Sequence, residues 1–292
     1  MSIESLLDQS REILDKAIVD YSPYAKVIMF SGGNDSRLVY WVLRALGHRP
    51  DAIIHGETGT GIPECHRFCR EFAAANDERL IVANYGAGEN YRRRLLRKGW
   101  FGRGMRAHSM AYNLLKSQPF RKVISDTFRH RKRHRNVLML CGARAAESRN
   151  RAENYAKSYY NADPSIAANI WVNLVWEWGD ADKRDFLADQ PGQQGLVPSL
   201  LHRSGDCMCG TMQSKQEGEE AAYWFPDWAE GWWNPLRQEV REAGFSWDWG
   251  DNLPKNLARL EKIDPLAPQP FMPACIACQQ LSLYDMIKGD SA

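Results

Sequence analysis

The residues best suited to chemistry form one short loop, Ser31-Gly32-Gly33-Asn34-Asp35-Ser36. It follows the apolar run Lys26–Phe30 and precedes the helical pattern Arg37–Leu46. Glycines let a backbone approach an anion closely, and the amides at the start of a helix point at phosphate oxygens. The two serine hydroxyls add donors. Because the loop matches neither GxxxxGK[ST] nor GxGxxG, it indicates a phosphate site of another kind.

Asp35 is the unexpected member of this loop, because a carboxylate repels phosphate. It is expected either to cap the helix or to hold Mg²⁺. An ordinary strand-to-helix turn could also contain two glycines and a capping Asp or Ser. The position of the loop after the first strand of an alternating strand–helix pattern favours binding.

A second candidate anion site follows the apolar run Asn136–Cys141. Gly142 lets the chain turn, and Arg144 and Arg149 supply planar donors suited to phosphate or sulfate. Glu147 could pair with one of them and fix its rotamer. A solvated helix with i,i+4 ion pairs has the same charge pattern, so the residues alone leave both interpretations open.

The stretch Arg92–Arg135 contains fifteen Lys and Arg residues and one acid, Asp126, in a chain whose net charge is +2. Runs of like charge are most often solvated loops. A nucleic-acid backbone would also neutralise such a density. Both interpretations stay open for this basic stretch.

Four of the seven cysteines form two close pairs, Cys207-Met-Cys209 and Cys275-Ile-Ala-Cys278. Four thiolates suit Zn²⁺ or a [4Fe–4S] cluster. The first spacing is tight for chelation, and unpaired buried thiols are the alternative. The other three cysteines, Cys65, Cys69 and Cys141, fall on a helix and a strand and are expected in the core.

Four short apolar runs alternate with helical patterns along the first half of the chain. This alternation predicts a parallel sheet with right-handed crossovers. We therefore predict an α/β fold with a doubly wound, mostly parallel sheet. The expected strands are Lys26–Phe30, Asp51–His55, Leu80–Asn84 and Asn136–Cys141, and the expected helices are 3–20, Arg37–Leu46, Pro63–Asn76 and a segment near His108–Ser117.

The composition changes after about residue 170, since nine of the eleven tryptophans lie between Trp171 and Trp249. Packing inside a small lobe is favoured over base stacking for these side chains. We predict a nucleotide-binding domain over 1–205 and a Cys/Trp-rich C-terminal region over 206–292. The chain has neither a long apolar run nor the pattern of a signal peptide, so we expect a cytoplasmic protein with reduced cysteines and no membrane contact.

Four segments resemble the motifs of the PP-loop ATPase superfamily, and of its phosphoadenosine phosphosulfate (PAPS) reductase-like family in particular. The loop Ser31–Ser36 resembles SGGxDS, and His55–Glu64 is similar to the second-strand motif, although Glu57 replaces the usual aspartate. His108–Lys116 resembles a motif ending in Leu-Lys, and Gly142–Arg149 resembles Gly-x-Arg-x-x-Glu-Ser-Arg. The four matches lie in family order over roughly residues 25–155.

This resemblance implies an adenine nucleotide alpha hydrolase-like fold that binds ATP or another adenylyl nucleotide with Mg²⁺. Cluster-bearing sulfonucleotide reductases have an adjacent cysteine pair and a later CxxC, which implies a 4Fe–4S cluster here, with Zn²⁺ as the alternative. Those reductases end in a Glu-Cys-Gly-Leu-His tail whose cysteine attacks sulfur, whereas this chain has no cysteine after Cys278. The expected nucleotide-binding residues are Ser31, Gly32, Gly33, Asn34, Asp35, Ser36, Glu57, Thr58, Gly142 and Arg144; the expected substrate- or anion-binding residues are His108, Lys116, Glu147, Ser148 and Arg149; and the expected metal ligands are Cys207, Cys209, Cys275 and Cys278.

Three functional hypotheses follow, and none assigns a catalytic residue. The first is an enzyme that adenylates or thiolates a substrate, with nucleic acid bound through Arg92–Arg135 as one candidate acceptor and a sulfur donor or thiol protein as partner. The second is a sulfonucleotide reductase variant that uses an external thiol. The third is a non-catalytic nucleotide-binding module. The sequence leaves a homo-oligomer open.

Overall fold

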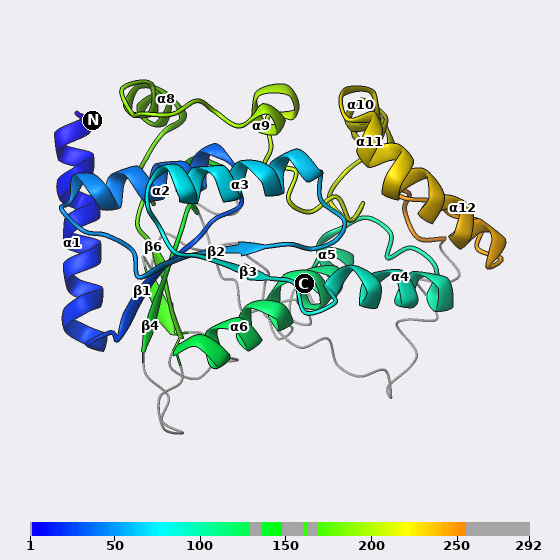
Figure 1. Cartoon of the computed structure of the whole chain (residues 1–292), viewed down its shortest axis with the longest axis horizontal. Helices are drawn as coiled ribbons and strands as arrows, with labels where there is room; N and C mark the ends of the chain where they lie inside the picture. Colours follow the sequence, from blue (N-terminus) through cyan, green and yellow to red (C-terminus); the bar gives the residue numbers. More distant parts are fainter. Residues whose placement is uncertain (1, 129–135, 148–159, 163–168, 255–292) are drawn as a thin grey trace, which may run out of the picture.

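The computed structural model describes residues 2–128, 136–147, 160–162 and 169–254 (Figure 1). Within these residues, one six-stranded sheet has the order β3-β2-β1-β4-β6-β5. Its strands are parallel except for β5, which pairs antiparallel with β6. The strands are β1 Ala25–Met29, β2 Ala52–Gly56, β3 Leu80–Ala83, β4 Val137–Cys141, β5 Tyr160–Ala162 and β6 Asn169–Asn173.

Side chains of successive strand residues enter two different cores, as the two-residue period of a strand requires. Ile28 packs into the first core with Leu14 and Leu38, which come from the helices α1 (Ile3–Tyr21) and α2 (Asn34–Ala45). The neighbouring Val27 packs into the second core with Val123 of α6 (Gln118–Phe128). Helices therefore cover both faces of the sheet, as Figure 1 shows, and the predicted doubly wound α/β fold is confirmed.

Strand β1 lies at the point where the sheet reverses its order. The chain moves from β1 through α2, β2 and α3 (Pro63–Ala75) to the edge strand β3, and then returns to place β4 on the other side of β1. In open α/β sheets, ligands bind at such a switch point, outside the carboxyl ends of the strands. The loop that follows β1 therefore lies where this fold binds ligands.

In sequence, α4 and α5 come between β3 and α6, and α8 to α12 follow β6. In Figure 1, α8 and α9 lie above α2 and α3, and α10 to α12 lie at the right of the view above α4. The ion pair between Arg92 of α4 and Glu239 of α12, at 2.8 Å, joins these two groups. The bounds are α4 Ala87–Lys98, α5 Met105–Tyr112, the π-helical η1 Asn113–Ser117, the 3-10 turn η2 Ala145–Glu147, α8 Asp180–Ala188, α9 Leu196–Leu201, α10 Lys215–Trp224, α11 Pro226–Trp228, the π-helical η3 Ala229–Trp233 and α12 Asn234–Glu242.

The tryptophans of the second half mostly serve packing, as predicted. Trp228 and Trp233 stack with ring centroids 5.6 Å apart, and Trp233 meets Trp249 edge-on. Six of these side chains are buried, namely Trp171, Trp176, Trp178, Trp228, Trp233 and Trp249. None of the helices in the described part is both long enough and apolar enough to cross a bilayer.

Candidate functional site

The phosphate loop has the predicted strand–loop–helix geometry. β1 ends at Met29, and α2 begins at Asn34 after Gly33 in an extended conformation. Among the described residues, the amides of Asn34, Asp35 and Ser36 donate no hydrogen bond to a protein acceptor. The Gly33 amide donates to Ser31 Oγ at 3.4 Å, which is long for such a bond. The first turn of α2 thus presents donors that no protein group occupies.

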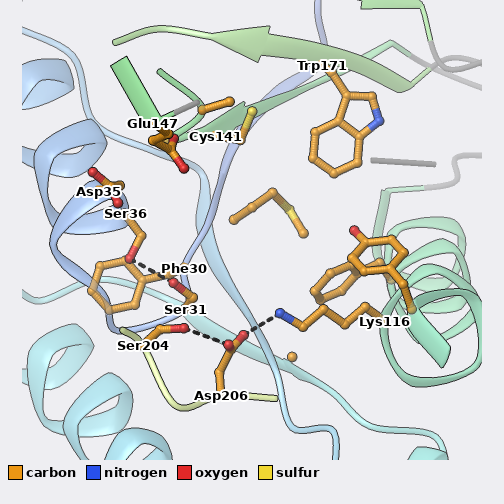
Figure 2. Close-up of a pocket in the computed structure, with 16 residues that line it drawn as sticks. Phe30, Ser31, Asp35, Ser36, Lys116, Cys141, Glu147, Trp171, Ser204 and Asp206 are labelled. Atoms are coloured by element: carbon orange, nitrogen blue, oxygen red, sulfur yellow. Dashed lines mark hydrogen bonds and ion pairs between the residues drawn. The ribbon is translucent and has the colours of Figure 1, made fainter. Parts of the chain in front are cut away.

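These donors lie beside a cavity of about 300 Å³. Figure 2 shows Ser31 and Ser36 on one side of it, Ser204 and Asp206 next to them, and Lys116 and Trp171 across from them. The cavity covers the ends of β1 and β4, which flank the switch point. Its lining is Met29, Phe30, Ser31, Asp35, Ser36, Gly56, Tyr112, Lys116, Phe120, Cys141, Gly142, Ala143, Glu147, Trp171, Ser204 and Asp206.

Two cations hold the carboxylate of Asp35. Its Oδ1 accepts from Arg144 Nε at 2.7 Å and from Lys183 Nζ at 2.9 Å. The Arg144 side chain is 3% exposed, and its other contacts are the Asp180 carboxylate and the Trp178 carbonyl. The negative charge beside the phosphate loop is therefore offset. This contact was not expected from the sequence, which suggested a helix cap or a magnesium ligand.

Gly142 explains how β4 and the phosphate loop come so close. A Cβ on this residue would lie 2.7 Å from the carbonyl carbon and oxygen of Asp35. Only a residue without a side chain can occupy the position while α2 keeps its place. The glycine that the sequence assigned to a turn thus also permits a close backbone contact.

A buried ion pair between Lys116 and Asp206 completes the lining of the cavity. Lys116 Nζ, carried by η1, lies 2.5 Å from Asp206 Oδ2, and Ser204 Oγ donates to Asp206 Oδ1 at 2.7 Å (Figure 2). Asp206 is 6% exposed. Burial opposes ionisation of this carboxyl group, but the charge and hydrogen bond of Lys116 outweigh it and lower the pKa of Asp206.

The segment that carries Asp206 is fastened to the loop after β2. Thr58 Oγ1 donates to the Asp206 carbonyl at 2.8 Å, and the Met208 amide donates to Thr60 Oγ1 at 3.2 Å. Cys207 and Cys209 belong to this fastened segment, directly after the lining residue Asp206. A hydrogen bond from Cys207 lowers the pKa of Cys209 well below its ordinary value, and His108 and Thr211 act in the same direction.

A second group of titratable side chains lies beneath the phosphate loop. Cys65 Sγ donates to the Ser31 carbonyl at 3.1 Å, and a Cβ on Gly32 would lie 3.0 Å from Cys69 Sγ. His55 is fully buried, with Nε2 2.7 Å from His66 Nδ1. The three cysteines expected in the core are buried, although Cys141 also lines the cavity.

The structure brings six of the residues expected from the sequence to the cavity lining, namely Ser31, Asp35, Ser36, Gly142, Lys116 and Glu147. Gly32, Gly33 and Asn34 belong to the same loop. Glu57 pairs with Arg70 on the surface. Thr58, Arg144 and His108 do not line the cavity: Thr58 bonds to Asp206, Arg144 bonds to Asp35, and His108 bonds to Thr211. Ser148, Arg149, Cys275 and Cys278 lie outside the described residues. No group of three side chains within the described part could hold a metal ion.

Four contributors were missed from the sequence: Ser204, Asp206, Lys183 and Trp171. None belongs to a recognisable motif, and the first two come from a loop far along the chain. A lone aspartate next to a cysteine pair was the only available signal for Asp206. The expected boundary between residues 205 and 206 separates two residues that line the same cavity, and it stays a prediction.

Comparison with known proteins gives only distant structural likeness. No protein-family model matches the chain, and no curated protein matches its sequence. Among solved structures, a PAPS reductase from Candida auris in a phosphate complex is similar, with 17% identity and a TM-score of 0.46 over 68% of this chain and 92% of that one. The FMN adenylyltransferase of Candida glabrata, solved with FAD and inorganic pyrophosphate, has 10% identity and a TM-score of 0.44 over 65% and 57%. At these values the likeness assigns no function.

Proposed function

We propose that this chain is an enzyme that binds ATP, grips its pyrophosphate in the loop Ser31–Ser36 and transfers the adenylyl group to a substrate oxygen. In that reaction the substrate oxygen attacks the α-phosphorus, the bond from it to the bridging oxygen breaks, and pyrophosphate leaves with the electron pair. The loop would stabilise charge on the leaving group through donors that are already in position.

The observation that carries this proposal is the set of amides at Asn34, Asp35 and Ser36. They have no protein acceptor within the described residues, and they lie beside a cavity at the switch point of the sheet. The hydroxyls of Ser31 and Ser36 are 3.4 Å apart, so a phosphate oxygen can replace this weak contact. Amides and hydroxyls together suit an anion with several oxygens.

The oxygen atoms of the lining suit a nucleotide bound with Mg²⁺. Asp35, Glu147 and Asp206 bring carboxylates to the cavity, and Lys116 is the single cation among its described lining residues. Because protein cations already pair with Asp35 and Asp206, a metal ion has to neutralise most of the charge of a triphosphate. Carboxylate and phosphate oxygens are the ligands that Mg²⁺ prefers, so we expect ATP binding to weaken when EDTA removes the metal.

The thiols of Cys207 and Cys209, which follow the lining residue Asp206 in the chain, support a sulfur-related role for the second step. Cys207 and Cys209 are separated by one residue, and the interaction with Cys207 lowers the pKa of Cys209, which favours the Cys209 thiolate. Thiolates are the form that binds Zn²⁺ or an iron–sulfur cluster. A bound cluster or Zn²⁺ would involve these two sulfurs together with Cys275 and Cys278, which the structure does not describe.

The decisive experiment is ATP–pyrophosphate exchange with the purified full chain and an oligonucleotide as the acceptor of the adenylyl group. Adenylyl transfer is supported if labelled pyrophosphate exchanges into ATP in the wild type and if the variant Gly33→Val abolishes this exchange. The ideal Cβ at this position already lies 3.1 Å from Ser204 Cβ, so valine would obstruct the loop. Sulfite release from PAPS with an external thiol would instead support the reductase alternative, and nucleotide binding without turnover would support the binding module. Absence of any binding to ATP or pyrophosphate would contradict the proposal.

Nucleic acid is the acceptor favoured by the basic stretch. Within the described part, no acidic side chain lies within ion-pair distance of Arg97, Lys98, Arg103 or Arg106. Binding of a labelled oligonucleotide should weaken steeply with salt. The double variant R103Q/R106Q should reduce the salt slope by about two, whereas R11Q, which removes an exposed charge on α1, should not change it.

A further inference from the structure

We propose that Asp206 is a positioning residue, which holds the ammonium group of Lys116 at the wall of the nucleotide cavity so that it meets the negative charge of the bound ligand. This inference deepens the proposed function and rests on it. Neither residue belongs to the phosphate loop, and nothing in the sequence linked Asp206 to Lys116.

Asp206 is held by two bonds to its carboxylate and one to its backbone. Ser204 donates to Oδ1, Lys116 donates to Oδ2, and Thr58 donates to the backbone carbonyl of the same residue. Ser204 itself lies against the phosphate loop, because its Cβ would be 3.1 Å from a Cβ on Gly33. The position of Asp206 is therefore tied to that of the loop.

Lys116 needs such a partner more than most lysines. Its side chain has four rotatable methylene groups, and holding it in one rotamer costs up to about 2 kcal/mol of entropy. It comes from the π-helical turn η1, an element that is frequent at functional sites. Its side chain is 17% exposed, so the ion pair is largely shielded from screening by salt.

The packing around Gly56 and Phe120 positions the Lys116 side chain at the cavity wall. A Cβ on Gly56, at the end of β2, would lie 2.9 Å from Phe120 and 4.0 Å from Lys116 Cγ. The absence of a side chain at Gly56 lets Phe120 close over the strand end, with the stem of Lys116 alongside. In Figure 2 the ammonium group lies across the cavity from Ser31 and Ser36. A phosphoryl group bound by the loop would thus lie between the donors of the loop on one side and the ammonium group of Lys116 on the other.

The test is a double-mutant cycle on the full chain. Wild type, D206N, K116M and D206N/K116M are compared by calorimetric binding of ATP and by KM and kcat in ATP–pyrophosphate exchange. If Asp206 acts through Lys116, D206N should weaken ATP binding about tenfold and should cost little more once Lys116 is gone. D206E, which keeps the charge, should recover part of the affinity. D248N is the matched control, because it breaks another largely buried ion pair, with Arg237, that does not line the cavity.

Each outcome decides between the two proposals. Additive effects of D206N and K116M, or a D206N protein that binds ATP as well as D248N, would overturn the positioning role while adenylyl transfer stands. A wild type that binds neither ATP nor pyrophosphate would overturn both. Should D206N fail to fold, S204A replaces it, since that variant removes the other side-chain hydrogen bond to the Asp206 carboxylate; it must then weaken ATP binding in the wild type and have no effect in K116M.

Discussion

Gly142→Ala tests how closely strand β4 must approach the phosphate loop. The added Cβ would lie 2.7 Å from the carbonyl carbon and oxygen of Asp35 and 2.9 Å from its Cβ. These separations are too short to persist. Two of the opposing atoms belong to the backbone, so they cannot turn away as the end of a long side chain can. Alanine must therefore displace the first turn of α2 from the end of β4.

The size of the effect follows from two opposing contributions. Gly142 is not among the glycines with positive φ, so alanine suits its backbone and should stabilise by about 0.4–1 kcal/mol through the unfolded chain. Overpacking costs about 1–3 kcal/mol. We expect a net loss of about 1–2 kcal/mol in the free energy of unfolding, which lowers Tm by about 2–8 °C in a protein of this size. Because the amides of Asn34 to Ser36 move with the turn, ATP affinity should fall about tenfold or more, as a loss of about 1.4 kcal/mol implies.

Urea unfolding and calorimetric ATP binding measure the two effects separately. Gly231→Ala is the matched control, since this glycine also lacks a positive φ and its Cβ would meet nothing within 4 Å. The control should be neutral or slightly stabilising. If Gly142→Ala behaves like Gly231→Ala in both measurements, the close approach of β4 is not what positions the phosphate loop.

Three further variants test the surroundings of the cavity. Asp35→Asn should lower the free energy of unfolding in urea by about 1–3 kcal/mol, because the buried Arg144 loses a charged acceptor; an unchanged midpoint would show that Asp180 suffices. Burial, followed by the charge of His55, lowers the pKa of His66 to about 4 from 6.5. The unfolded chain then binds a proton in this window that the folded chain does not, so the contribution of His66 is present above about pH 6.5 and is lost as pH falls to about 4; His66→Asn should flatten the stability curve there, and an identical curve would contradict this assignment. Trp249→Phe leaves the Met208 carbonyl without its 2.9 Å donor and should cost about 1–3 kcal/mol in thermal unfolding, whereas the exposed Trp224→Phe should cost little.

The strands β1 to β4 were predictable because buried parallel strands are apolar runs, which the sequence displays most clearly at Val137–Cys141, whereas β5 and β6 were not predicted. The helix α4 was missed because its apolar stripe, with Tyr91 and Leu95, is embedded in a run of arginines. Reading that run as one charged block hid the periodicity. Part of the charge serves the fold itself, since Arg92 pairs with Glu239.

The phosphate loop was predictable from adjacent residues, whereas the contribution of Asp206 to the cavity was not predictable in this way. A strand, two glycines and a helix start are adjacent in sequence and fix their own geometry. Asp206 reaches the site only because Thr58 and Thr60 fasten its segment to the loop after β2. Such a contact depends on the packing of the whole chain. The environment of Asp35 depends equally on the distant Lys183.

The charges of the cavity lead to a final prediction. Asp35 is offset by Arg144 and Lys183, Asp206 is offset by Lys116, and Glu147 accepts from the Arg144 amide. The donors of the phosphate loop itself are neutral amides and hydroxyls, and the ammonium group of Lys116 is already paired with Asp206. Screening by salt acts mainly on exposed net charge, so binding of the magnesium nucleotide should change little between low and physiological salt. Oligonucleotide binding to the exposed arginines should weaken steeply over the same range. Equal salt slopes for the two ligands would mean that both bind one charged surface, and the division between a loop that grips the nucleotide and a separate surface for the acceptor would fail.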